Sequence, residues 1–425
     1  MVKEPIKKII LSAALFITAL CLLSCAAPVK DKDAANDPGV IVPTDPAPSK
    51  TAAPTPEQTF TPTPEPAITP TPAPTPDPDA ELKAYISGMS VEEKIGQLLL
   101  FGFAGTGAPG SGGAALILKY PVGNIMFYGD NVDRSDGSGG FDTARARVNA
   151  FDELYPCSIG RLYAADVEGG SVVRFKWDPA LPAPFELGKG SPKEAREIFA
   201  RVGETLLSCG INLDLAPVFD VSPDPLSTAI GRRMISGDLE TVNSIGKAMI
   251  DGLHDGGCAA CAKHFPGHGG TTEDSHHVTP VVNKSREELY SYDIAAFGCA
   301  AENGADCVMA AHILYPALDE TDIASMSYPI LTGILRQELR FDGVVISDDM
   351  LMQGLSKSYP YSEAAVRFIL AGGDIVLCGA DPAVQEELIL SLYEAVENGV
   401  IGTERLDESV LRVLRLKQRL GIWEP

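Results

Sequence analysis

The sequence predicts a single (β/α)8 barrel, and two observations support this fold class. From about residue 81 to the end, short apolar runs alternate with helical stretches, and repeated strand-then-helix order implies a parallel sheet. Polar residues also recur where apolar runs end, at Asp166, His264, His312 and Asp348. The carboxyl ends of barrel strands converge on one mouth, so these side chains are expected to meet there. A doubly wound open sheet is the structural alternative.

The individual elements are predicted from local patterns. Ser90 and Glu93 form a capping box ahead of the periodic run Lys94–Leu100, which predicts a helix. Further predicted helices are Lys193–Cys209, Glu240–Asp255, Arg286–Asn303 and Ser362–Ala371. The candidate strands are Val122–Tyr128, Leu162–Asp166, Ile211–Ala216, Cys258–His264, Asp306–His312, Gly343–Asp348 and Ile375–Cys378. No Gly-x-Gly-x-x-Gly sequence opens a helix, so no nucleotide cofactor is expected.

The N-terminus has the pattern of a bacterial export signal. Lys3, Lys7 and Lys8 precede an apolar run that is short for a membrane-spanning helix and ends at Leu-Leu-Ser-Cys25. This ending resembles a lipoprotein cleavage box, in which Cys25 carries the lipid. We therefore expect a signal peptide over residues 1–24 and a domain anchored to the outer face of the bacterial cell membrane. An ordinary signal peptide or an uncleaved anchor is the alternative, and both also imply export.

Composition divides the remainder of the chain into two parts. Prolines, threonines and alanines dominate residues 25–80, which predicts a disordered tether rich in polyproline II, whereas residues 81–425 carry the folded pattern. The formal charge of −23 argues against nucleic acid as a partner. The seven cysteines after Cys25 are scattered and odd in number, unlike a disulfide framework. Cys258 and Cys261 resemble a redox or metal pair, but their apolar run favours buried structural thiols.

The segment Lys263–His277 contains four of the six histidines of the chain. His264 and His268 have the spacing of a zinc-binding helix, but Pro266 and Gly267 between them prevent a regular helix. A metal site is therefore disfavoured, and no metal is expected. A solvated loop with incidental histidines is a second alternative.

The favoured interpretation of this segment is an acid/base site. Asp274 and His276 are two residues apart, so in an extended or turning loop they face the same way. The carboxylate would then hold the imidazole tautomer and support its charged form.

Two further groups of residues are candidates for substrate chemistry. Asp348 and Asp349 end a buried strand. Asp348 would attack an anomeric carbon or stabilise an oxocarbenium ion, and the alternative is a strand-end aspartate that caps the next turn, a role expected of Asp349. Asp166 and Arg174 flank a glycine turn and would bind sugar hydroxyls, although an ion pair bracing the turn is the alternative. Of Arg232 and Arg233, one is expected to bind substrate and the other to lie on the surface.

The block Lys-His-Phe-Pro-Gly-His-Gly, followed by Asp-Ser-His, resembles the signature of glycoside hydrolase family 3, in its β-N-acetylglucosaminidase (β-hexosaminidase) branch. The resemblance extends from about Met89 to the C-terminus. It implies a barrel that stands alone and retaining hydrolysis of terminal, β-linked N-acetylglucosamine. Asp348 matches the nucleophile, His276 the general acid/base and Asp274 its orienting partner. The positions that match sugar-binding residues are Asp166, Arg174, Arg233, Lys263 and His264, while His268 is expected to support the loop.

The sequence departs from the family pattern at a few positions. Val167 replaces a common glutamine, Met234 and Ile235 replace a serine and a phenylalanine, and Leu351 replaces a small residue. These changes concern fine specificity, because no reacting group is lost. The expected substrates are peptidoglycan fragments, including muropeptides, or chitin oligosaccharides, and a monomer is expected. The alternatives are a phosphorylase, a β-glucosidase and a sugar-binding lipoprotein without turnover.

Overall fold

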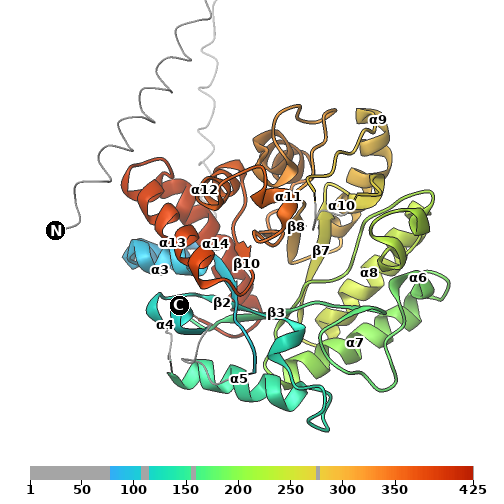
Figure 1. Ribbon diagram of the computed structural model, residues 1–425, viewed down its shortest axis with the longest axis horizontal. Helices are drawn as coiled ribbons and strands as arrows, with labels where there is room; N and C mark the ends of the chain where they lie inside the picture. Colours follow the sequence, from blue (N-terminus) through green and yellow to red (C-terminus); the bar gives the residue numbers. More distant parts are fainter. Residues whose placement is uncertain (1–76, 107–113, 155–158, 274–277, 425) are drawn as a thin grey trace, which may run out of the picture. The chain divides into compact units, whose positions relative to one another are not determined.

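The computed structural model describes residues 77–106, 114–154, 159–273 and 278–424 (Figure 1). Its main sheet has eight parallel strands in the order β10-β1-β2-β3-β6-β7-β8-β9. A parallel bridge between Ile346 and Ile375 joins the two ends of this order, so the sheet closes on itself. The chain thus forms the predicted (β/α)8 barrel, and the open-sheet alternative is wrong.

The strands are short, as expected for a barrel of this kind. They are β1 (Leu99–Gly102), β2 (Asn124–Phe127), β3 (Leu162–Ala165), β6 (Leu213–Asp214), β7 (Ala259–Phe265), β8 (Cys307–Ala310), β9 (Val344–Ser347) and β10 (Val376–Cys378). After β3, a small antiparallel pair is formed by β4 (Val167–Gly169) and β5 (Val172–Val173). This pair lies at the C-terminal ends of the barrel strands.

Helices surround the strands (Figure 1). They are α2 (Ala80–Gly88), α3 (Val91–Gln97), α4 (Ala115–Lys119), α5 (Phe141–Leu154), α6 (Pro184–Leu187), α7 (Pro192–Ser208), α8 (Leu239–Asp255), α9 (Arg286–Glu288), α10 (Ile294–Glu302), α11 (Gln353–Ser356), α12 (Tyr361–Ala371), α13 (Pro382–Glu397) and α14 (Thr403–Arg419), with π-helical segments at Leu289–Asp293 and Pro329–Glu338. Within the described ranges, no helix combines the length and the apolar character needed to cross a lipid bilayer.

The first predicted helix is correct at its start and wrong at its end. The capping box forms, since the Glu93 backbone N–H donates to the Ser90 hydroxyl at 3.2 Å and Glu93 accepts from the Ser90 backbone at 2.8 Å. The helix stops at Gln97, and Leu99 begins β1. Strand β1 pairs with β2 on one side and β10 on the other. This pairing is needed to close the barrel, so tertiary context overrides the helical pattern there.

Side chains from alternate strand positions fill the inside of the barrel. This cluster is buried and made of Leu100, Met126, Leu162, Ala164, Leu213, Leu215, Ala259, Cys261, Cys307, Met309, Val344, Ile346, Ile375 and Leu377, with Val413 and Leu416 of α14. At the N-terminal end of the strands, the buried ammonium of Lys417 in α14 donates to the carbonyl of Gly123 at 3.0 Å. The barrel is therefore packed and closed at its base. Cys258 and Cys261 are buried and form no disulfide, as expected for structural thiols.

Candidate active site

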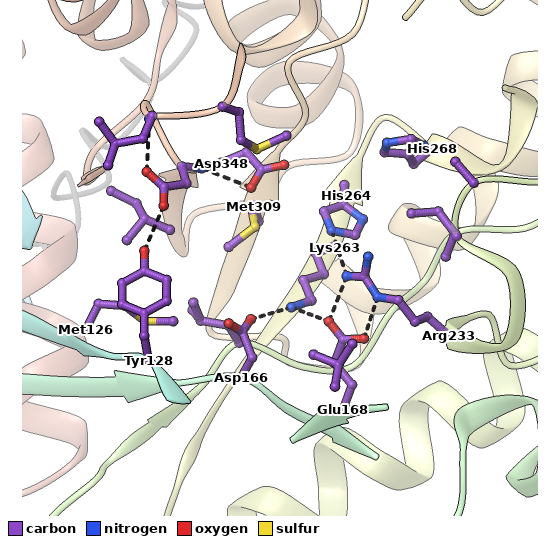
Figure 2. A pocket seen from close by; sticks show the side chains of 18 of the residues that line it. Met126, Tyr128, Asp166, Glu168, Arg233, Lys263, His264, His268, Met309 and Asp348 are labelled. Atoms are coloured by element: carbon purple, nitrogen blue, oxygen red, sulfur yellow. Dashed lines mark hydrogen bonds and ion pairs between the residues drawn. The ribbon is translucent and has the colours of Figure 1, made fainter. Parts of the chain in front are cut away.

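A cavity of about 460 Å³ lies at the C-terminal ends of the strands (Figure 2). Its floor includes Met126, Leu215, Met309 and Leu377, which also belong to the packed barrel interior. The cavity brings together most of the residues predicted from the sequence, namely Asp166, Arg174, Arg233, Lys263, His264, His268 and Asp348. Because the barrel interior closes it from below, the cavity opens only away from the barrel.

A buried ammonium lies at the centre of one wall of this cavity. The Nζ atom of Lys263 is 2.7 Å from Oδ1 of Asp166 and 2.6 Å from Oε1 of Glu168 (Figure 2). Arg174 donates to the other oxygen of Asp166. Arg233 binds Glu168 through two hydrogen bonds of 2.8 Å each. Three cations thus share two carboxylates in a network that spans β4, β7 and the segments that follow β3, β5 and β6.

The network keeps its members charged despite their burial. Burial raises the pKa of Glu168, but the charges of Lys263 and Arg233 outweigh it and hold that pKa at about 2. Burial likewise opposes ionisation of Asp166, and Lys263 and Arg174 hold its pKa well below the usual value. For Lys263, burial lowers the pKa, but the two carboxylates raise it above its ordinary range. The wall therefore presents fixed donors and acceptors that are already paired with one another.

Asp220 fixes the orientation of His264. Oδ2 of Asp220 is 2.7 Å from Nδ1 of His264, and Oδ1 accepts from the backbone N–H groups of His264 at 3.1 Å and His268 at 2.6 Å. On the other side of the ring, Nε2 lies 3.3 Å from Nη2 of Arg233. Since Arg233 is only a donor, Nε2 accepts and Nδ1 carries the proton that faces Asp220. His264 thus extends the charge network.

His264 and His268 do not have the arrangement of a zinc-binding helix. His264 lies within β7, and His268 begins a short 3-10 turn, so no helix presents the two rings together. Among the described residues, no group of three or more His, Cys, Asp or Glu side chains is arranged to hold a metal ion. For His268, burial lowers the pKa, which favours the neutral ring.

Asp348 faces the charge network from the far side of the cavity (Figure 2). It follows β9, and its backbone N–H donates to the carbonyl of Ala310 at 3.0 Å. Its Oδ1 accepts from the backbone N–H of Asp349 at 2.9 Å. His312 donates from Nε2 to the Asp348 carbonyl at 3.1 Å, and burial lowers the pKa of this imidazole. The backbone on which the carboxylate sits is therefore held by the neighbouring strand β8 and by the loop that follows it.

Asp349 caps the turn, as the sequence predicted. Its Oδ1 accepts from the backbone N–H groups of Leu351 at 3.0 Å and Gly379 at 2.9 Å. Its Oδ2 accepts from the hydroxyl of Tyr128 at 2.8 Å. Burial raises the pKa of Asp349. All of these bonds turn its carboxylate toward the protein, whereas the neighbouring Asp348 lines the cavity.

The predicted acid/base pair, Asp274 and His276, lies outside the described residues. Gly267 and Lys284, which lie on either side of this segment in the sequence, both approach Asp293 in the π-helical segment Leu289–Asp293. Nζ of Lys284 is 2.5 Å from one Asp293 oxygen, and a Cβ on Gly267 would lie 2.5 Å from the other. Burial raises the pKa of Asp293 to about 6. Gly267 and Lys284 thus meet at one buried carboxylate.

Three participants in this site were not predicted. Glu168 follows Asp166 by two residues, and alternation in an extended segment was a signal that the two side chains share a face. Asp220 and Tyr128 contact the site through partners distant in sequence, so local pattern offers no signal for them. Arg232 lies outside the cavity lining and pairs with Glu186, which makes it the surface arginine of the two.

The sequence matches the profile of the "Glycosyl hydrolase family 3 N terminal domain" over residues 90–416. It is 30% identical over 334 residues to the beta-hexosaminidase A of Pseudoalteromonas piscicida, covering 72% of this chain and 54% of that protein. It is 33% identical over 284 residues to a beta-hexosaminidase of Bordetella avium, covering 64% of this chain and 78% of the relative. The chain belongs to glycoside hydrolase family 3.

Solved structures of similar proteins have the same barrel. A glycoside hydrolase family 3 beta-N-acetylglucosaminidase from Paenibacillus aligns with a TM-score of 0.73 at 34% identity, covering 79% of this chain and 63% of that one. A beta-N-acetylhexosaminidase from Beutenbergia cavernae aligns with a TM-score of 0.71 at 27% identity, covering 78% of this chain and 99% of that one. The chain thus spans about half of the Pseudoalteromonas relative and most of the Beutenbergia protein.

Replacement of Glu168 by alanine is expected to destabilise the domain. The change leaves Lys263 and Arg233 buried without one shared carboxylate, and removing one partner of such a pair costs about 3–5 kcal/mol of unfolding free energy. The fold holds the pKa of Glu168 below its ordinary value. Its contribution to the unfolding free energy is therefore present above that ordinary pKa and is lost as the pH falls toward about 2. The difference between wild type and variant should therefore shrink in acid.

Urea denaturation at a series of pH values measures this difference. The matched control is Glu197→Ala, an exposed residue of α7 whose nearest cation, Lys193, is 3.8 Å away. This control should change the unfolding free energy by no more than about 1 kcal/mol. Equal effects of the two substitutions at neutral pH would contradict the role assigned to the network.

Proposed function

We propose that the protein is a retaining exo-β-N-acetylglucosaminidase. It would remove terminal, non-reducing, β-linked N-acetylhexosamine from peptidoglycan fragments or chitin oligosaccharides. The observation that carries this proposal is the position of Asp348, whose carboxylate faces a network of fixed polar groups across a cavity of about 460 Å³. The named activities of the beta-hexosaminidase relatives support the same class of substrate.

The closed base of the cavity supports removal of a terminal sugar. Met126 and Met309 lie beneath the site and belong to the packed interior, so a glycan has no exit through the barrel. The hydroxyls of one sugar ring would bind between Asp166, Arg174 and Lys263, with His264 and Arg233 beside them. Since these groups are already held by one another, little reorganisation accompanies binding.

The proposed reaction proceeds in two displacements at the anomeric carbon. In the first, a carboxylate oxygen of Asp348 bonds to C1, the glycosidic C–O bond breaks, and protonated His276 gives its proton to the departing oxygen. In the second, water attacks C1 and releases Asp348, while neutral His276 accepts the proton of the water. Asp274 would orient the imidazole throughout. An imidazole has an ordinary pKa of about 6.5, which suits both donation and abstraction.

Two variants test the roles of the reacting groups. Asp348→Ala removes the nucleophile and is expected to lower kcat on 4-nitrophenyl N-acetyl-β-glucosaminide at least about a thousandfold. His276→Ala removes the acid/base and should cost about a hundred- to ten-thousandfold. The control Glu397→Ala changes an exposed residue of α13 outside the cavity lining and should leave kcat unchanged.

The same assay separates the competing activities. Wild type should cleave the N-acetylglucosaminide far faster than the corresponding glucoside, and a preference for the glucoside would refute the substrate class. Full activity of either variant would refute its residue assignment. In phosphate buffer, sugar 1-phosphate in place of free sugar would identify a phosphorylase.

We also propose that the protein is exported and held at the outer face of the cell membrane by a lipid on Cys25. This proposal rests on the residues around Cys25, and the Pro/Thr-rich stretch would then separate the catalytic domain from the membrane. Cys25→Ala should shift the protein from the membrane fraction to the soluble exported fraction, as measured by immunoblot. An unchanged membrane fraction for this variant would refute lipid anchoring through Cys25.

A further inference from the structure

A second cavity, of about 810 Å³, lies apart from the one that holds Asp348. Its walls come from the loop between β2 and α5, from the segment that follows β5, and from one face of α7. Among the described residues, no lining residue is shared between the two cavities. The proposed reaction makes no use of this second cavity.

One wall of the second cavity is aromatic. Phe141 stacks on the buried ring of Phe175, with centroids 4.6 Å apart and planes inclined by 7°. Trp177 meets Phe141 edge-on at 5.1 Å. Phe141 and Trp177 are only half-buried, and both line the cavity. Apolar ring surface therefore remains open to a ligand there.

The rim of the same cavity carries charges of both signs that are not engaged. Lys176, Asp178, Glu194 and Arg201 are exposed, and within the described ranges their side chains have no hydrogen-bond or ion-pair partner. On the same helix as Arg201, Arg196 instead binds Asp255 through two hydrogen bonds. Charged donors and acceptors that are available to a ligand thus lie beside an aromatic surface.

This combination fits a saccharide better than other ligands. A pyranose ring has an apolar C–H face that packs on an aromatic ring and hydroxyls that bond to both carboxylates and cations. A simple anion would pair with the cations but leave Asp178 and Glu194 unpaired beside it, and an apolar ligand would desolvate four charges without pairing them. The net charge of −23 also disfavours nucleic acid.

We propose that the cavity beside Trp177 is a second, non-catalytic saccharide-binding site for the polymer on which the enzyme acts. This inference rests on the proposed function for the identity of the glycan. Lys176 follows Arg174 by two residues, so the segment after β5 lines both cavities in turn. Arg134 lines the second cavity and donates to the carbonyls of Arg174 at 3.1 Å and Val173 at 3.3 Å.

Because the segment after β5 contributes residues to both cavities, binding at the second site would affect how a polymeric substrate reaches Asp348. A glycan held beside Trp177 keeps its neighbouring chain ends close to Asp348, which raises their effective concentration. A single aryl sugar occupies only the catalytic cavity and gains nothing from this site. The second site should therefore affect polymer binding and polymer turnover without affecting the aryl substrate.

Binding to insoluble chitin and to purified peptidoglycan tests the proposal with the full chain in an Asp348→Ala background. The double variant Lys176→Ala/Arg201→Ala removes two exposed cations without partners, and Trp177→Ala removes the aromatic surface. Each change is expected to weaken polymer binding about three- to tenfold, the range measured for aromatic and cation contacts. The matched control is Lys193→Ala, an exposed residue of α7 outside the cavity lining.

The same variants with Asp348 intact are then assayed on 4-nitrophenyl N-acetyl-β-glucosaminide and on the polymer. Unchanged aryl turnover with reduced polymer turnover supports the second site. Polymer binding equal to wild type in the double variant overturns it, even if Trp177→Ala fails to fold. Absence of aryl turnover in the wild-type protein instead refutes the proposed function, while the binding comparison still decides the second site.

Discussion

The site depends on one buried ammonium, that of Lys263, which lies between the carboxylates of Asp166 and Glu168. A lone charge at this depth would be too costly to bury, and so would either carboxylate. Together they fix the positions of Arg174 and Arg233, and through Arg233 they reach His264. The polar wall of the cavity is therefore a single structure, in which no member holds its place alone.

The barrel also places a further carboxylate, that of Asp348, on the opposite side of the cavity from this network. Asp348 lies on a different strand, and its backbone is held by Ala310 and His312 from the neighbouring strand and the loop after it. Asp349 is turned into the protein by Tyr128 and two backbone N–H groups. Adjacent aspartates thus have different environments, and only one is left facing the place where a sugar would bind.

The sequence predicted the site best at the C-terminal ends of the barrel strands, where the fold itself brings candidate residues together. Asp166, His264 and Asp348 were predicted to lie together because parallel strands in a barrel end at one mouth, whereas Lys263 was predicted only through the family resemblance. Strand β1 was mistaken for the end of a helix, because its apolar run continues the helical period of α3 and only barrel closure makes it a strand. Asp220 acts through contacts made far along the chain, which no local pattern reveals. Asp274 and His276 stay predictions based on the sequence motif.

Covalent trapping is the most direct test of whether Asp348 becomes bonded to the anomeric carbon. A 5-fluoro N-acetylglucosaminyl fluoride should inactivate the enzyme with one sugar per chain, because the fluorine at C5 slows both displacements while the fluoride leaving group keeps the first one fast. Mass spectrometry of proteolytic fragments should then find the sugar on Asp348. A label on another carboxylate, such as Asp166, or continued turnover without any glycosyl-enzyme, would contradict the account.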